Sequence, residues 1–593
     1  MATRTFGWIQ NPSDFKKLKL TVQVFDKNSK HYDQLKTRLV PDLIPNKSVK
    51  STLLKLLSAN ETTFKYKDLV GSSSTALGTP SPSRRQAVAD SLLQVTILPQ
   101  NARTSGKKWT DDWTADGFLR WAVTLGFVEH NREFDTFTIT ESGKLFSQSK
   151  VKPEEDPILL TAMLQYPPAY RVLSLIEKHS ENGGANKFQI GNELGFKGEI
   201  GFTSYSADLM EYELINAPTN KEKTKIRQDT EGTSDKYARM IATWLGKLSL
   251  TRSLKTTLQT PNGPIHGFPR YVITLKGKQA LNNVRGKSSH KKRPKRINWE
   301  YLATAVPNRD YHRTRRAIIL EALQTSTSIE SLLHQCLDKG FETNKAELKM
   351  DLRNLTNIGI DIDISDKTAQ LRDDIIGLNI PPSTVTKKLE DEQYENLKTE
   401  LIRETDLPDD CYELLDLAYD GRSNRALEIQ TAALFEEHLN FNVVLMGGGK
   451  RPDIVATSDS GFSLIIDTKA YRKGYGKSIS QEDAMVRYIE DCKFNDPQRN
   501  DTKWWEAINQ TISRDRVYFL WVSSFFLPTF AAQINSTSRR TGFNGSALSI
   551  DHLLRATDTY RKGGIQHADL ELTFSSNEVN SDAHYKWLES NNS

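Results

Sequence analysis

Cysteine is scarce in this sequence, and its hydrophobic runs are short. Only three cysteines occur in 593 residues, Cys336, Cys411 and Cys492, and none forms a Cys-x-x-Cys motif. This excludes a zinc finger made of cysteines and argues against a disulfide framework, so we expect reduced thiols. The absence of an apolar run of about 18 residues argues against a membrane span. The polar N-terminus predicts no secretory leader, so we expect a cytoplasmic protein.

The net charge of +6 conceals an uneven distribution. Residues 387–593 carry 24 Lys and Arg against 33 Asp and Glu, a net charge of −9, which leaves +15 for residues 1–386. Phosphate contacts dominate non-specific affinity for nucleic acids. We therefore expect the basic part to hold DNA and the acidic part to bind it weakly on its own.

The strongest chemical pattern lies in the acidic part. Asp453 stands on one predicted strand, and Asp467-Thr468-Lys469 stands on the next. Side chains alternate along a strand, so Asp467 and Lys469 share a face while Thr468 points away. Paired carboxylates suit Mg²⁺, and an adjacent ammonium stabilises negative charge in a phosphoryl transition state. The pattern predicts a metal-dependent phosphodiesterase.

An ordinary hairpin with exposed charged residues is the alternative interpretation of this short motif. The glycine turn at 447–449 and the apolar strand at 464–466 favour the catalytic interpretation.

Two stretches of the basic part share one layout. In the first, a predicted helix opening at 116–121 is followed by strands and by Ile-Thr-Glu-Ser-Gly-Lys at 139–144. In the second, a helix opening at 235–240 is followed by strands and by Ile-Thr-Leu-Lys-Gly-Lys at 273–278. This is the outline of a winged helix-turn-helix, whose second helix can lie in a major groove. Such units also serve as protein-contact scaffolds, so this alternative stays open.

Weaker patterns complete the organisation. A third copy is expected from 313 to 371, with a strand at 358–363. The basic run at 285–296 predicts an exposed connector close to DNA, or else a solvated basic turn. The break near 379–390 predicts the main linker, and the composition of 72–85 predicts a loop.

Five segments, in the same order along the chain, resemble the FokI family of type IIS restriction endonucleases. They are residues 4–12, 116–122, 234–241, 313–317 and 467–471.

The resemblance implies a multidomain α+β chain. Three DNA-recognition domains of winged helix-turn-helix type would be followed by an α/β nuclease domain of the PD-(D/E)xK class. The expected limits are 1–150, 151–286 and 287–378 for the recognition domains, 379–390 for the linker and 391–593 for the nuclease domain.

The resemblance also implies site residues. Asp453, Asp467 and Lys469 would form the cleavage centre, with Mg²⁺ on the two aspartates and water as the nucleophile. Glu428, on the preceding helix, has a role near the metal or is an exposed helical carboxylate. The residues implied to contact bases are Gln10, Asn11, Trp113, Gln228, Glu231, Lys236 and Arg239.

The side-chain types of the second recognition domain fit base recognition. Lys236 and Arg239 lie three apart on one helical face and can donate to guanine, while Glu231 can accept from cytosine N4. Phosphate anchoring is the alternative role for the two cations. Gln228 stands where the family has an asparagine, and its amide offers the same donor and acceptor pair. The family has an arginine in the first domain at a point where this chain has an insertion. Arg84 and Arg85 are equal candidates for the role of that arginine.

Asp483 and Arg487 share a face of a predicted helix at 481–492. An intrahelical ion pair between them would contribute about 0.3 to 0.5 kcal/mol. The resemblance implies instead that two nuclease domains meet about a two-fold axis, with Asp483 of one facing Arg487 of the other. Since one centre hydrolyses one strand, a double-strand break needs two copies.

The expected function follows from these parts. The resemblance implies a monomer that binds an asymmetric double-stranded site, GGATG, and cuts both strands about one helical turn away after transient dimerisation of its nuclease domain. It also implies a partner DNA methyltransferase and a bacterial cytoplasmic location. The rival interpretation is a DNA-binding regulator with a vestigial nuclease domain, which the intact set of Asp453, Asp467 and Lys469 disfavours.

Overall fold

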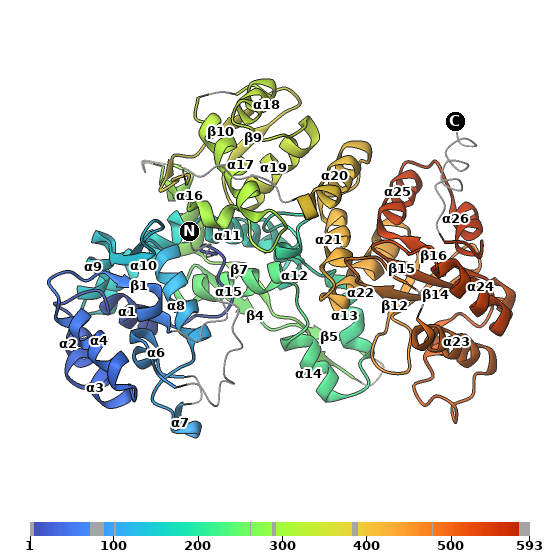
Figure 1. Ribbon diagram of the computed structural model, residues 1–593, viewed down its shortest axis with the longest axis horizontal. Helices are drawn as coiled ribbons and strands as arrows, with labels where there is room; N and C mark the ends of the chain where they lie inside the picture. The colour runs from blue at the N-terminus through green and yellow to red at the C-terminus, as the bar shows by residue number, and fades with distance from the viewer. Residues whose placement is uncertain are drawn as a thin grey trace.

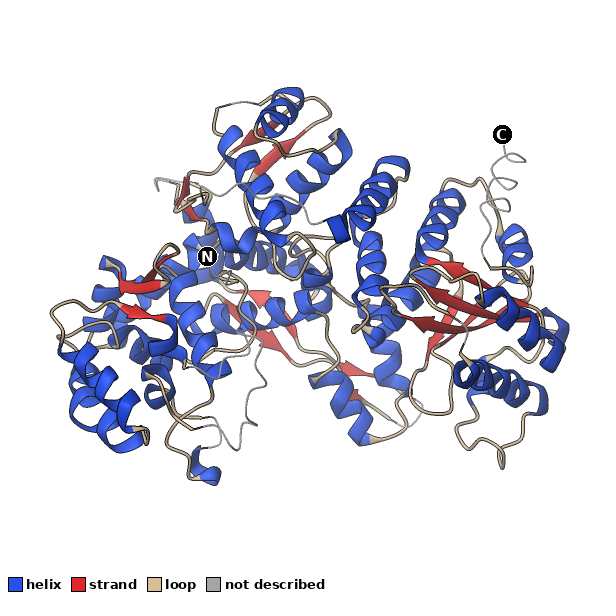
Figure 2. Ribbon diagram, viewed as in Figure 1, coloured by secondary structure: helices blue, strands red, loops and turns tan. Residues whose placement is uncertain are grey.

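The computed structural model shows a chain in which helices predominate and one large sheet lies near the C-terminal end (Figures 1 and 2). The structure describes residues 5–71, 88–99, 102–260, 263–286, 292–325, 327–381, 389–476 and 478–579. The expected loop at 72–85, with Arg84 and Arg85, and most of the expected linker lie outside these residues. Within the described residues, none of the helices combines the length and apolar character that a membrane-spanning segment requires.

The first two units of the chain are mainly helical. The first contains α1 (Phe15–Gln23), α2 (Lys30–Gln34), α3 (Val40–Leu43), α4 (Lys47–Ser58), β1 (Phe64–Lys65), α5 (Tyr66–Val70), α6 (Leu92–Thr96), α7 (Ala102–Ser105), α8 (Asp112–Thr124), β2 (Val128–Asn131), β3 (Thr136–Ile139) and α9 (Glu141–Gln148). The second contains α10 (Lys152–Gln165), α11 (Pro167–His179), α12 (Lys187–Gly191), α13 (Ala207–Asn216), α14 (Asn220–Gln228), α15 (Thr233–Lys247), β4 (Thr251–Leu254), β5 (Thr257–Leu258), β6 (Ile265–His266), β7 (Arg270–Ile273) and α16 (Leu275–Val284).

The remaining two units are a small helical one and the sheet-containing one. The third contains β8 (Lys295–Arg296), α17 (Arg309–Ala322), α18 (Ile329–Asp338), α19 (Lys345–Asn357), β9 (Ile362–Ile364), β10 (Ala369–Leu371) and β11 (Ile375–Ile376). The fourth contains α20 (Leu389–Glu404), α21 (Glu413–Asp420), α22 (Asn424–Ala433), β12 (Asn442–Leu445), β13 (Ile454–Ser458), β14 (Phe462–Lys469), α23 (Ile479–Phe494), β15 (Val517–Ser523), α24 (Phe530–Thr541), β16 (Gly545–Ser549), α25 (Ile550–Arg561) and α26 (His567–Phe574).

The repeated Ile-Thr-x-x-Gly-Lys sequence caps a helix at the same place in both units. Thr140 precedes α9, where its hydroxyl accepts the Gly143 N–H at 3.0 Å and donates to the Gly126 carbonyl at 2.7 Å. Thr274 makes the equivalent two bonds before α16, at 3.1 and 2.7 Å. The predicted order of helix, ribbon and Ile-Thr-x-x-Gly-Lys motif is confirmed in both units, although α8 begins four residues before the expected Asp116. The helix that the motif opens was not predicted.

The glycine of this motif lets the capped helix pack against the preceding turn. A Cβ on Gly143 would overlap the carbonyl oxygen of Phe127, and a Cβ on Gly277 would overlap that of Leu250. Each carbonyl lies in the segment that follows a principal helix, α8 or α15. The motif therefore fixes the ribbon against the helix before it.

Two expectations for the middle of the chain are wrong in detail. The expected strand at 358–363 is observed as β9, which starts at Ile362, because the chain turns through Gly359 at φ +104°. The basic connector at 285–296 is not exposed throughout. Lys295 is fully buried, 2.8 Å from Asp373 and 3.5 Å from the centre of the Tyr170 ring, so it fastens the connector to the third unit.

A stacked tryptophan pair joins the first two units. Trp121 of α8 and Trp244 of α15 have ring centroids 4.9 Å apart, at an interplanar angle of 23°. Both side chains are completely buried, and the Trp244 indole donates to the Pro12 carbonyl at 2.8 Å. Phe15 stacks on the other face of this pair, 5.5 Å from Trp121. The two principal helices and the N-terminal segment thus share one core.

The large sheet has strand order β12-β13-β14-β15-β16. β13 runs antiparallel to both of its neighbours, β12 and β14, whereas β14, β15 and β16 run parallel. Leu464 and Ile466 of β14 pack on the side covered by α21, α22 and α25, whereas Ile465 packs on the side covered by α23 and α24. Because side chains alternate, Asp467 and Lys469 project on the same side as Ile465, toward α23.

The sheet-containing unit is not separate from the second unit. Phe188, Leu209 and Leu214 of the second unit belong to the same hydrophobic cluster as Leu427 of α22 and Ile454 of β13. In Figure 1, α13 accordingly lies beside α22. The two units are joined through apolar contacts as well as through the chain.

The glycine of the capping motif gives a stability prediction. Gly277→Ala should lower the free energy of unfolding by about 1 to 3 kcal/mol, because the new Cβ has no space beside the Leu250 carbonyl. Gly246→Ala in α15 is the matched control, since the nearest atom to its Cβ would lie 3.7 Å away, and alanine favours a helix interior by roughly 0.5 to 1 kcal/mol. Thermal unfolding of both variants measures the difference. Equal midpoints would show that the capped helix is not fixed by this contact.

Candidate active site and DNA-binding surface

The register of β13 and β14 brings two aspartates together. Ile454 pairs with Ile466, so Asp453, just before β13, lies opposite Asp467. The Asp453 N–H donates to the Ile466 carbonyl at 3.2 Å. Thr468 then fixes the Asp453 carboxylate, because its N–H and its hydroxyl donate to Oδ2 at 2.7 and 3.2 Å.

Asp467 and Lys469 lie on one face of β14, as expected. Lys469 Nζ is 2.6 Å from Asp467 Oδ2, and the two side chains are 16% and 9% exposed. Burial, reinforced by the nearby Asp453 carboxylate, raises the pKa of Asp467 to about 7 against the opposing effect of Lys469. A buried carboxylate beside a second one is an arrangement that a bound cation would stabilise.

Glu428 lies at the edge of this site. It is on α22, and its Oε2 pairs with Arg425 Nη1 at 2.5 Å. Burial raises the pKa of Glu428, and the charge of Asp453 raises it further, which indicates that the two carboxylates are close. Gly447, at φ +68°, allows this approach, because a Cβ there would overlap the Arg425 side chain. The glycine turn thus brings α22 to the candidate cleavage centre.

The donor set fits a divalent cation with hard oxygen ligands. The hydrogen bond and the ion pair described above use Oδ2 of Asp453 and of Asp467, and among the described residues no hydrogen bond occupies Oδ1 of either. These two Oδ1 atoms are the candidate ligands, with Glu428 near them. Carboxylate oxygens, with no sulfur or imidazole among them, are typical of a magnesium-type site.

Two further residues at the rim were not found from the sequence. Burial raises the pKa of Glu213, on α13 of the second unit, to about 7 against the opposing charges of Arg425 and Arg451. Arg425 stands three residues before Glu428, a spacing that signals a helical ion pair and could have identified it. The approach of Glu213 has no sequence signal, because it depends on how two distant units pack.

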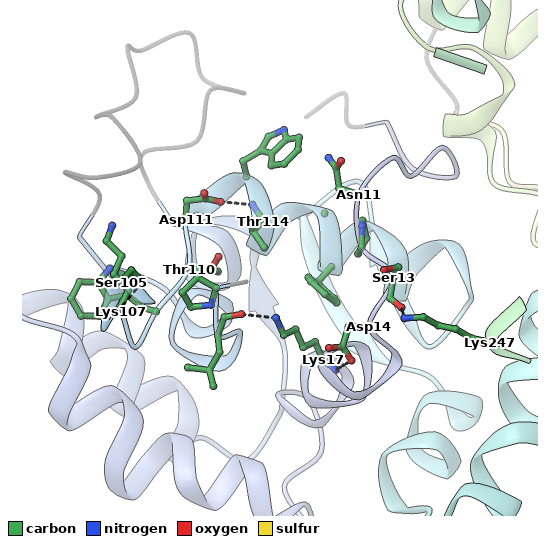
Figure 3. A pocket seen from close by; sticks show the side chains of 17 residues that line it. Asn11, Ser13, Asp14, Lys17, Ser105, Lys107, Thr110, Asp111, Thr114 and Lys247 are labelled. Carbon is green, nitrogen blue, oxygen red and sulfur yellow. Dashed lines mark hydrogen bonds between the residues drawn. The ribbon is translucent and has the colours of Figure 1, made fainter. Parts of the chain in front are cut away.

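In the first unit, a cavity of about 950 Å³ lies beside the start of α8. Figure 3 shows Asn11, Lys107, Asp111 and Lys247 around it. Trp113 also lines it from the first turn of α8 and is 49% exposed. Two of the predicted base-contacting residues, Asn11 and Trp113, are therefore brought to one hollow, whereas Gln10 hydrogen-bonds Tyr237 of α15 instead.

In the second unit, the predicted residues surround the start of α15. Gln228 is exposed at the end of α14, and Lys236 is half-buried near the first turn of α15. Glu231 is only 7% exposed, and both of its oxygens accept from Arg239, at 2.7 and 3.0 Å. Lys187 adds a third contact at 2.9 Å.

This network holds the Arg239 guanidinium in one place. Burial alone would raise the pKa of Glu231, but the hydrogen bonds from Arg239 and the charge of Lys187 outweigh it, and the pKa falls. Glu231 stays ionised in consequence. In the free protein its carboxylate faces Arg239 rather than solvent, while the Arg239 side chain remains 38% exposed.

The helix proposed for pairing is α23, and the intrahelical pair is not observed there. Asp483 Oδ1 is instead 2.7 Å from Arg540 Nη2 on α24. The Arg487 guanidinium lies 5.4 Å from the centre of the Tyr488 ring. Asp483 is 54% exposed, so it remains available at the surface.

Models of known protein families match each of the four units of this chain. Four family models match in order: FokI recognition domain subdomain 1 at residues 4–149, recognition domain subdomain 2 at 155–289, D3 domain at 302–367 and cleavage domain at 387–580.

Individual relatives agree with these models. The type II restriction enzyme FokI of Planomicrobium okeanokoites is 35% identical over 97% of this chain and 99% of its own length. The type II restriction enzyme StsI of Streptococcus sanguinis is 27% identical over 94% of this chain and 92% of its own length. The structure of FokI bound to DNA has a TM-score of 0.88 at 33% identity, covering 97% of this chain and 99% of that one.

The Glu231 network predicts that this residue acts through Arg239. Glu231→Gln and Arg239→Ala should each weaken DNA binding, and the double variant should be no weaker than Arg239→Ala alone, because Glu231 contributes by orienting that guanidinium. Equilibrium binding of the three variants to a duplex carrying the site measures this. Additive losses would mean that Glu231 contacts the DNA independently.

Proposed function

The chain belongs to the FokI family of type II restriction enzymes, and from this premise we propose that it binds the asymmetric site GGATG as a monomer and cuts both strands at a fixed distance outside it. Cleavage would be Mg²⁺-dependent hydrolysis at Asp453, Asp467 and Lys469. The observation that carries the proposal is the meeting of these three side chains on adjacent strands, with Lys469 Nζ 2.6 Å from Asp467.

The residues of the cleavage centre would divide the chemistry among them. Asp453 and Asp467 would hold Mg²⁺, which when bound lowers the pKa of a coordinated water and polarises the scissile phosphate. Lys469 would stabilise the negative charge that develops on the phosphate or orient the attacking water. Thr468 would keep Asp453 in position through its 2.7 Å bond to Oδ2.

Recognition would come from the first two units. The charge of +15 on residues 1–386 supports binding to the phosphate backbone. Asn11 and Trp113 would contact the DNA from the first unit, with Gln10 beside them. In the second unit, Lys236 and Arg239 would donate to guanines, and Gln228 would pair with an adenine through its amide.

Double-strand cleavage would need two copies of the chain. We propose that α23 of one nuclease domain meets α23 of another about a two-fold axis, with Asp483 facing Arg487. α23 packs on the side of the sheet that carries Asp467 and Lys469, which supports a link between pairing and catalysis. As in other restriction systems, a DNA methyltransferase specific for the same site would protect the host DNA.

The first test separates cleavage from binding. Asp467→Ala and Lys469→Ala should each lower cleavage by about 10³-fold or more while leaving site binding unchanged, because they remove a metal ligand and a charge that stabilises the transition state. Asp459→Ala, an exposed aspartate in the same hairpin, is the matched control and should cut normally. Plasmid linearisation in Mg²⁺ and binding in its absence measure the two properties.

Two results would contradict this assignment. Substantial nicking by Asp467→Ala in Mg²⁺ would remove Asp467 from the chemistry. A wild-type chain that binds one duplex sequence tightly yet cuts no DNA with any divalent cation would favour the regulator with a vestigial nuclease domain. Sequencing the cut ends of wild-type products gives the site and the offset together.

The second test concerns the α23 contact. Asp483→Arg and Arg487→Asp should each bind the site but fail to linearise plasmid, since like charges would face each other across the two-fold axis. A mixture of the two should regain cleavage, because each cross-contact then pairs opposite charges.

The intrachain pair of Asp483 supplies the control for this test. Arg540→Ala removes the 2.7 Å contact to Asp483 and the 3.0 Å contact to Glu482 without placing a new charge on α23, so it should cut normally. Full activity of Asp483→Arg alone would exclude α23 from the dimer contact.

A further inference from the structure

Three side chains able to bind a metal converge away from the cleavage centre. Asp410 and Cys411 lie in the single 3₁₀ turn Asp409–Tyr412 before α21, and His438 ends the π-helical turn Leu434–His438 that follows α22. One carboxylate oxygen, the thiol sulfur and one imidazole nitrogen lie within 4.8 Å of one another. The three residues are of different chemical types and come from two separate elements.

Two of these donors make no side-chain hydrogen bond within the described part of the chain, although Asp410 lies near the Lys197 ammonium. Cys411 is only 4% exposed, and among the described residues no hydrogen bond holds its thiol. Asp410 is half-buried and makes neither a side-chain hydrogen bond nor an ion pair within the described part of the chain. A buried cysteine often packs as a small hydrophobe, so what marks this cluster is the meeting of a thiol, a carboxylate and an imidazole at one point rather than an unmet hydrogen bond.

The three donors also line one small cavity. Its volume is about 30 Å³, and Lys197 and Glu437 lie at its border. A cavity of roughly 10 to 15 Å³ holds one water, so this space is large enough for a single ion or for a water that completes its coordination.

We propose that Asp410, Cys411 and His438 form a binding site for a zinc-type divalent cation, separate from the cleavage centre. Thiolate, imidazole and carboxylate are the ligands that Zn²⁺ prefers, and three protein ligands with one water complete a tetrahedral site. Mg²⁺ prefers oxygen alone, so the two sites differ in metal as well as in place. On binding, the Cys411 thiol releases its proton to solvent and coordinates as the thiolate.

Nearby charges set the strength of this site. Asp410 and Glu437 favour a cation, whereas Lys197 and Arg561 oppose it. Arg561 Nη1 donates to His438 Nδ1 at 2.7 Å, so its positive charge lies beside the site, and it must leave if the imidazole coordinates through that nitrogen. Because the Arg561 side chain is exposed, it can rotate into solvent. The site is therefore expected to bind more tightly when Arg561 is removed.

The metal would join the start of α21 to the end of α22. α22 carries Glu428 and reaches the cleavage centre, and α21 pairs with α22 in the hydrophobic cluster of the nuclease domain. A metal at this point would stabilise the nuclease fold without entering the reaction.

Cobalt gives a direct test on the full chain. The reduced, metal-stripped protein is titrated with Co²⁺ in excess Mg²⁺, and absorption is followed in the near ultraviolet, where only thiolate-bound cobalt has a charge-transfer band. We expect the band at one cobalt per chain, its loss in Cys411→Ser and its retention in Cys336→Ser and Cys492→Ser. His438→Gln should weaken binding by about tenfold or more, and Arg561→Ala should tighten it several-fold.

Thermal unfolding supplies a second readout. Zn²⁺ should raise the melting temperature of the wild type and of Arg561→Ala but not that of Cys411→Ser, since a cation that binds only the folded state stabilises it. If Cys411→Ser does not fold, His438→Gln and Arg561→Ala still test the site through their opposite changes in cobalt affinity. Absence of the band at saturating Co²⁺, or its persistence in His438→Gln at unchanged affinity, overturns the proposal.

Discussion

The antiparallel register of β13 with β14 is the constraint on which the nuclease domain depends. Pairing Ile454 with Ile466 sets Asp453 opposite Asp467, and a slip of one residue would turn the second carboxylate to the other side of the sheet. The apolar residues on both sides of β14 prevent such a slip, because Ile465 and Ile466 are fully buried against different helices. Packing of the sheet therefore fixes the geometry of the charged site.

The same alternation connects the cleavage centre to the rest of the domain. Asp467 and Lys469 project toward α23, and Glu428 reaches the site from α22 on the opposite side. A buried carboxylate group of this kind is stable only with compensating positive charge, which Lys469 and Arg425 supply in part. The site is thus an electrostatic unit built from one strand pair and the helices beside it.

Local patterns made much of this molecule predictable from its sequence. The period of two along β14 predicted the shared face of Asp467 and Lys469, and the repeated Ile-Thr-x-x-Gly-Lys predicted two units that the Thr140 and Thr274 caps confirm. Features that depend on distant segments had no local signal. The partner of Asp483 is 57 residues away on another helix.

Other features were not predicted, because they also depend on contacts between distant segments. Lys295 was expected in an exposed connector. It is instead buried in an ion pair with Asp373, which lies far along the chain. Glu213 approaches Arg425 only because two domains share a core. The base-contacting residues stay predictions, since their assignment rests on the resemblance, and the network of Glu231 could not be deduced from spacing.

The stacking of the Trp121 indole on Trp244 fixes the distance between the principal helices of the first two units. The helices that carry Trp113 and Arg239 are joined through a buried aromatic core, which holds the span between them. One extra base pair in the middle of a target adds about 3.4 Å of rise and roughly 35° of rotation. Under the proposed recognition, this fixed span would make binding depend on the spacing of the contacted bases as well as on their identity.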